Sequence, residues 1–98
     1  MSNKNEDKEF FDRADEIINL ANTQCDNTAI AKVSSSLLFA AARFNAFIIA
    51  SSAKDVEDLK KDKTEAIKYF KEQYEKVFIE NMDEYIKNYG KNIEEQRN

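Results

Sequence analysis

One apolar segment, residues 33–50, constrains the fold more than any other part of the chain. It is rich in Ala and Leu and lacks Gly and Pro, which favours a helix over a strand. Three serines at positions 34–36 offer hydroxyl groups that can cap the start of this helix. The uninterrupted part, residues 37–50, is shorter than the roughly 20 residues that cross a bilayer, and it contains Arg43 and Asn45. We therefore predict a buried helix and no membrane span.

Apolar side chains surround this segment on nearly every side. At about 100° per residue they form three stripes along different faces of the helix. The stripes are Val33, Leu37, Ala41, Phe44 and Ile48; Leu38, Ala42, Asn45 and Ile49; and Phe39, Arg43, Ala46, Phe47 and Ala50. Two neighbouring helices of a small bundle cover two faces, so the third face needs another partner. We expect a second copy of the chain to supply it, with a candidate interface formed by Leu38, Phe39, Phe47 and Ile49.

The composition points to an all-α fold. The chain of 98 residues has one Gly and no Pro, whereas tight β-turns depend on such residues. This length suits one domain with a modest core. We predict a three-helix antiparallel bundle with a long C-terminal helix, forming a single domain over residues 1–98. Its ordered core is expected at about 6–89, between polar tails.

Two further helices are predicted beside the central one. The first runs from about residue 6 to residues 22–24 and places Phe10, Ile17 and similar residues on one face. Residues 29–32 could form a helical turn or a coil. The third helix is expected from Asp55, as N-cap, to Gly90 at the C′ position.

The length of the third helix raises a packing problem. Unbroken, it would span about 50 Å, whereas the central helix would reach only about 30 Å. Either it breaks near residues 62–65 or near Asn81, or its free end packs against a partner subunit. Asn81 could set the register of a dimer, or simply face solvent at a kink.

Charge and cysteine content limit the kinds of partner and the cellular compartment that we expect for this protein. Fifteen Lys and Arg against nineteen Asp and Glu give a net charge of −4 with the signs interspersed, which argues against a nucleic-acid surface. Cys25 is the sole cysteine, a pattern typical of a reducing compartment. The first residues lack the apolar stretch of a secretory signal. We expect a cytoplasmic protein.

The residues that usually carry catalysis are absent. The chain has no His, which removes the commonest general base and metal ligand. Glu80, Asp83 and Glu84 share one helical turn but cannot form a Glu-x-x-His di-iron site. No glycine-rich phosphate loop is present, and Cys25 has no His to activate it. We predict no enzyme activity, no catalytic residue, no cofactor and no metal site.

Arg43 and Asn45 are unusual inside the most apolar segment. A buried Arg requires a carboxylate partner, and the candidates by position are Asp15, Glu16, Glu65 and Glu72. The pair could fix the register of the helices. Alternatively, Arg43 and Asn45 could anchor a small ligand in a pocket between helices.

Several strings resemble a family of short bacterial proteins known only as a domain of unknown function. They lie at residues 11–15, 20–24, 33–46, 66–70 with Gln73 and Tyr74, and 80–85. The most specific block is Ala-Ala-Arg-Phe-Asn-Ala at residues 41–46. The resemblance covers residues 10 to 86 and implies a bacterial, soluble, helical protein, with no catalytic residue to transfer.

These observations lead to two functional hypotheses. The first is a non-enzymatic helical protein that self-associates through its central helix, most simply as a homodimer. The alternative is a small-ligand-binding regulatory protein that uses Arg43 and Asn45. An enzyme that relies on carboxylates alone would need two close carboxylates with separated pKa values, and the spacing identifies no such pair.

Overall fold

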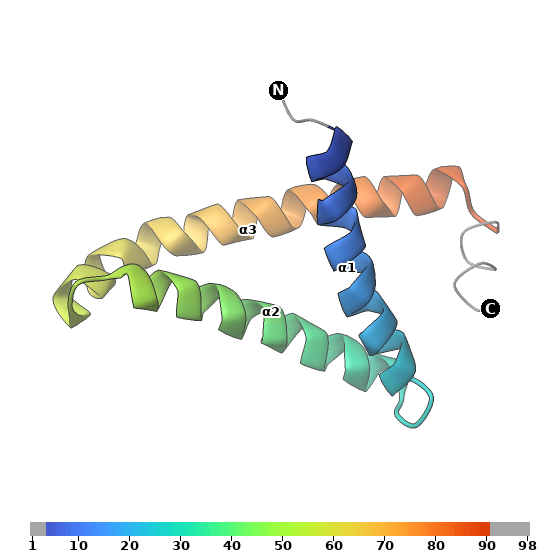
Figure 1. The fold of residues 1–98 in the computed structure, drawn as a ribbon, viewed down its shortest axis with the longest axis horizontal. Helices are drawn as coiled ribbons and strands as arrows, with labels where there is room; N and C mark the ends of the chain where they lie inside the picture. Colours follow the sequence, from blue (N-terminus) through green and yellow to red (C-terminus); the bar gives the residue numbers. More distant parts are fainter. Residues whose placement is uncertain (1–3, 91–98) are drawn as a thin grey trace. The chain divides into compact units, whose positions relative to one another are not determined.

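The computed structural model describes residues 4–90 and contains three α-helices (Figure 1). They are α1 (Lys4–Gln24), α2 (Ile30–Ser52) and α3 (Val56–Lys87). Over residues 4–90 there is no strand, so the all-α class with three helices is confirmed. The predicted polar tails lie largely outside the described residues.

The chain divides into two units, Met1–Ile48 and Ile49–Asn98, and the boundary falls inside α2. The antiparallel arrangement of the three helices stays a prediction, as does a single domain over residues 1–98. Each unit is described separately.

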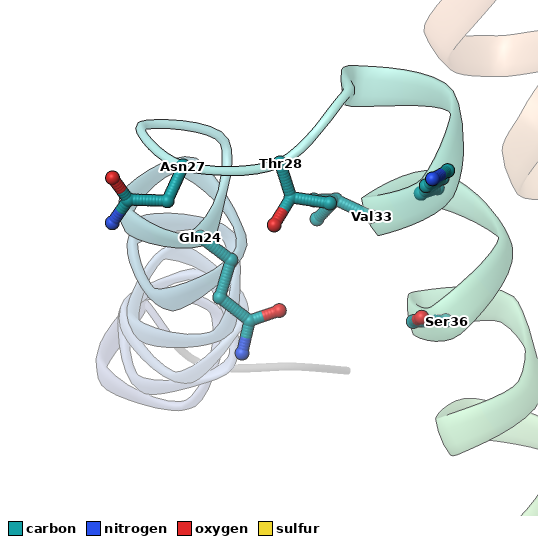
Figure 2. A pocket seen from close by; sticks show the side chains of 6 residues that line it. Gln24, Asn27, Thr28, Val33 and Ser36 are labelled. Carbon is teal, nitrogen blue, oxygen red and sulfur yellow. The ribbon is translucent and has the colours of Figure 1, made fainter.

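In the first unit, α1 ends in a tight turn that leads to α2. The amide N–H groups of Cys25, Asp26 and Asn27 each donate to a carbonyl three residues earlier, which closes the last turn of α1. Gln24 and Thr28 lie at the junction, on the side that faces α2 (Figure 2). Among residues 7–90, Val33 at 6% exposure is the buried apolar side chain. The junction, rather than the middle of either helix, is therefore the best-packed part of this unit.

The start of α2 differs from the prediction. The helix begins at Ile30, because the N–H groups of Lys32 and Val33 already donate to the Ala29 carbonyl at 3.0 and 3.2 Å. The serines at 34–36 thus lie inside the helix and do not cap it. Serine is tolerated in a helix at a small cost in propensity.

The longer α2 also changes the membrane argument. In the part of the chain that the structure describes, α2 is a helix of sufficient length and apolar composition to cross a membrane. The length argument against a span is therefore wrong, since the helix has 23 residues. The argument from charge remains, because Arg43 lies close to the middle of the helix.

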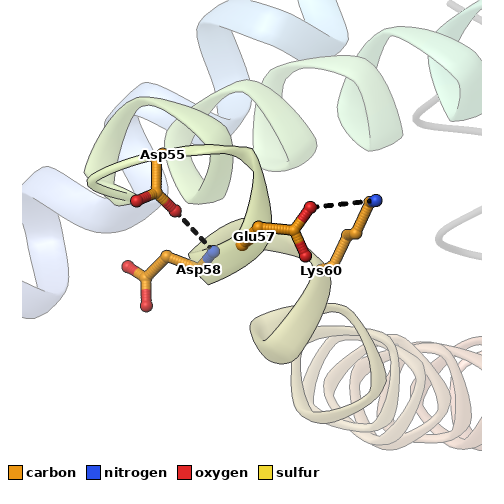
Figure 3. Close-up of polar contacts among 4 residues, drawn as sticks. All are labelled: Asp55, Glu57, Asp58 and Lys60. Carbon is orange, nitrogen blue, oxygen red and sulfur yellow. Dashed lines mark hydrogen bonds and ion pairs between the residues drawn. The ribbon is translucent and has the colours of Figure 1, made fainter.

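In the second unit, α3 starts at a well-formed cap (Figure 3). Asp55 has an extended backbone, and its Oδ1 accepts from the Asp58 N–H at 2.8 Å. Asp58 Oδ2 in turn accepts from the Lys54 N–H at 3.2 Å. This reciprocal arrangement resembles a capping box and satisfies two N–H groups at the start of the helix. The predicted N-cap is confirmed.

The third helix is continuous from Val56 to Lys87, with no break near residues 62–65 or at Asn81. Its 32 residues correspond to about 48 Å. The Asn81 side chain donates to the Val77 carbonyl of its own helix at 2.8 Å.

The end of α3 comes earlier than predicted. Asn88 is the C-cap, since both its backbone N–H and its side-chain amide donate to the Glu84 carbonyl. Gly90 has the positive φ (93°) expected of a helix-ending glycine, but it lies two residues beyond the cap.

Candidate functional site

The candidate interface on α2 is largely uncovered. Leu38, Phe39 and Phe47 expose 56%, 67% and 64% of their surface, while Ile49 is half-buried. Large apolar side chains with this exposure carry a free-energy penalty in water. The structure therefore leaves an apolar surface on the helix where the sequence predicts an interface.

This exposed surface extends around α2. Phe39 and Phe44 are five residues apart, which separates their directions by about 140° on a helix. Both are nevertheless exposed, with Phe44 at 65%. One neighbouring helix cannot cover both directions, so the surface has room for more than one partner element.

Arg43 lies within this surface and is exposed rather than buried. Among the described residues it forms no ion pair with Asp15 or Glu16, two of the predicted partners. The reason is that the first unit packs at the α1–α2 junction and leaves the middle of α2 open. Pairing of Arg43 with Glu65 or Glu72 stays a prediction. Asn45, the second candidate polar residue, is half-buried.

A pocket of about 340 Å³ lies at the α1–α2 junction. Its lining residues are Gln24, Asn27, Thr28, Lys32, Val33 and Ser36 (Figure 2). Neither Arg43 nor Asn45 lines it, so it gives no support to a ligand site built on those two residues. The sequence did not predict this pocket, because its amides, hydroxyls and single ammonium match no binding motif. Thr28, Ser36 and Lys32 are residue types that can act as nucleophiles, but the lining contains no His or carboxylate to serve as their general base.

Groups for metal or redox chemistry do not converge in the described residues. No cluster of three or more His, Cys, Asp and Glu side chains able to hold a metal ion is found within residues 4–90. Cys25 is a free, half-buried thiol in the turn after α1. On α1, the hydrogen bond from the Lys8 ammonium to Asp12, together with the carboxylate charge, raises the pKa of Lys8.

A second exposed apolar stripe lies on α3. From the sequence, Met82 and Ile86 are predicted as part of one broad apolar face of the third helix, whereas Ile79 was left out. Ile79, Met82 and Ile86 are 51%, 46% and 68% exposed and follow one another at spacings of three and four residues. Another apolar stripe of α3 consists of Ile67, Phe70, Tyr74 and Val77, which follow an a/d heptad spacing. Ile79, Met82 and Ile86 follow the same kind of spacing but lie on a different side of the helix.

Comparison with known proteins places these features in a family. A family model described as "Protein of unknown function (DUF3144)" matches residues 10–86. The NMR structure of the protein NB7890A from Shewanella sp. is similar, with a TM-score of 0.72 and 36% sequence identity. That similarity covers 82% of this chain and 85% of the other. No curated protein matches.

Proposed function

We propose that this chain, which belongs to the DUF3144 family of proteins of unknown function, is a non-enzymatic cytoplasmic protein that forms a homodimer through α2. The observation that carries the proposal is the exposure of Leu38, Phe39 and Phe47 on a helix that is apolar on nearly all sides. A surface of this kind on a small protein marks an interaction site.

The free energy available from this surface is of the same order as the cost of association. Completing the burial of Leu38, Phe39 and Phe47 in both copies would contribute roughly 6 to 11 kcal/mol, given 1.5–3 kcal/mol for a fully buried side chain. Association itself costs about 4–15 kcal/mol. The α2 surface alone therefore supports at most a weak dimer, and a stable dimer needs further contacts from other helices.

Sedimentation equilibrium of the wild type and of Phe39→Asp and Phe47→Asp tests the proposal. A carboxylate at either position would have to be buried without a partner, so both variants should dissociate at concentrations where the wild type is dimeric. Phe39→Leu and Phe47→Leu are matched controls that keep the surface apolar and should stay associated. If the wild type is monomeric at every concentration, or if the Asp variants associate as strongly as the wild type, the proposal is wrong.

A further inference from the structure

Arg43 limits which surface can pack against α2. It lies one helical turn from both Phe39 and Phe47, and no ion pair to its guanidinium is found among the described residues of its own unit, Met1–Ile48. An interface that covers the two phenylalanines also removes water from Arg43, and a desolvated Arg needs a carboxylate. α2 contains no Asp or Glu. Two α2 helices packed face to face would bring like charges together and supply no counter-charge.

α3 carries a stripe with the complementary character. Glu72, Glu75, Ile79, Met82 and Ile86 follow a spacing of three, four, three and four residues, which keeps them on one face of a helix. We call this face the Glu72–Ile86 stripe. It combines two carboxylates with three exposed apolar side chains, and neither carboxylate forms an ion pair among the described residues of the second unit.

The Glu72–Ile86 stripe is separate from the other apolar stripe of α3. Glu72 is five residues from Ile67, so the two stripes point about 140° apart. A helix that packs on the stripe of Ile67, Phe70, Tyr74 and Val77 therefore leaves the Glu72–Ile86 stripe open.

We propose that, in the homodimer, α2 of each copy docks on the Glu72–Ile86 stripe of the other copy. Arg43 pairs with Glu72 and Glu75, while the phenylalanine one turn further along α2, Phe39 or Phe47 according to the direction of the helix, packs beside Ile79. Two-fold symmetry forms this contact twice. The inference rests on the proposed self-association and identifies the surface that completes it.

The pairing of Arg43 with Glu72 and Glu75 can be tested by reversing the charge on each side and then mixing the two variants. Arg43→Glu places three carboxylates together, and the double variant Glu72→Arg/Glu75→Arg places three cations together, so each protein alone should dissociate at least about ten-fold more readily than the wild type. An equimolar mixture of the two should recover a heterodimer, because one contact then has reversed charges and the other is wild type. Glu80→Arg, on a different face of α3, is the matched control and should dimerise normally. Circular dichroism should show equal helix content in all variants.

The outcomes separate this inference from the proposed function. If the wild type dimerises and Arg43→Glu does too, the Arg43 pairing is wrong although self-association stands. A third protein carries Arg43→Glu, Glu72→Arg and Glu75→Arg in one chain. If the equimolar mixture forms no heterodimer but this triple variant has the wild-type mass, the charges pair within one copy and the inference is wrong. A monomeric wild type overturns the proposed function and this inference together.

Discussion

At the scale of single residues, the most specific interaction in the chain is the cap of α3. Asp55 was identified from the sequence because its residue type, with Glu57 and Asp58 in the first turn, is typical of a helix start. Ser34 to Ser36 have equally good capping chemistry and are not caps, since the preceding residues extend the helix to Ile30. Cap chemistry is thus informative only where the residues before it do not favour a helix.

The first prediction concerns this cap. Asp55→Ala removes the acceptor of the Asp58 N–H and should lower the free energy of unfolding by about 1 kcal/mol. Thermal unfolding followed by circular dichroism should show a midpoint lower by several degrees. Asp55→Asn, which retains an acceptor oxygen, should differ from the wild type by only a few tenths of a kcal/mol. Equal midpoints for the Ala and Asn variants would contradict the assigned cap.

The second prediction concerns the pH dependence of α1. The Lys8–Asp12 pair, at 2.8 Å, raises the pKa of Lys8 above its ordinary 10.5. A raised pKa in the folded state means that the pair stabilises α1 below pH 10.5, and that this contribution is lost as the pH rises through the folded-state pKa. NMR titration of the Lys8 side chain should show a lower pKa in Asp12→Asn. Asp15→Asn, two turns from Lys8, should leave the Lys8 pKa unchanged.

At the scale of helices, the sequence predicts type well and boundaries less well. The absence of Pro and the periodicity of the apolar residues were sufficient for three helices. The exact start of α2 and end of α3 depend on hydrogen bonds to the carbonyls of Ala29 and Glu84, which periodicity does not encode. The Glu72–Ile86 stripe was not recognised as a separate face for a different reason: Met82 and Ile86 were assigned to one broad apolar face of the third helix.

The third prediction distinguishes the two sides of α3. Ile79→Asp places a carboxylate on the Glu72–Ile86 stripe and should weaken the dimer, because a third carboxylate would be desolvated there. Gln73→Asp introduces the same group six residues earlier, about 120° around the helix from Ile79, and should leave the dimer mass unchanged. Sedimentation equilibrium measures both. Equal association of the two variants would exclude this stripe from the interface.

The fourth prediction concerns α2 and lipid. Although α2 has the length of a span, inserting Arg43 near the bilayer centre costs about 2.5–3.5 kcal/mol. The full chain should therefore remain unbound when mixed with vesicles of phosphatidylcholine and phosphatidylglycerol and separated by flotation. Recovery of the protein with the floating vesicles would mean that lipid, rather than a second copy, covers α2.

At the scale of the whole molecule, fold class and family were both accessible from sequence. The strings that resemble the family lie within residues 10–86, the span that the family model matches. The candidate site was accessible only in part. Leu38, Phe39 and Phe47 were identified because too many faces of α2 are apolar, whereas the surroundings of Arg43 depend on tertiary packing that spacing along one helix cannot predict.

Sedimentation velocity of the wild-type chain, from low to tens of micromolar, tests the central claim most directly. The account predicts a species of twice 11.4 kDa that gives way to monomer on dilution, as expected for a dimer of modest affinity. A single species of 11.4 kDa at every concentration would contradict it.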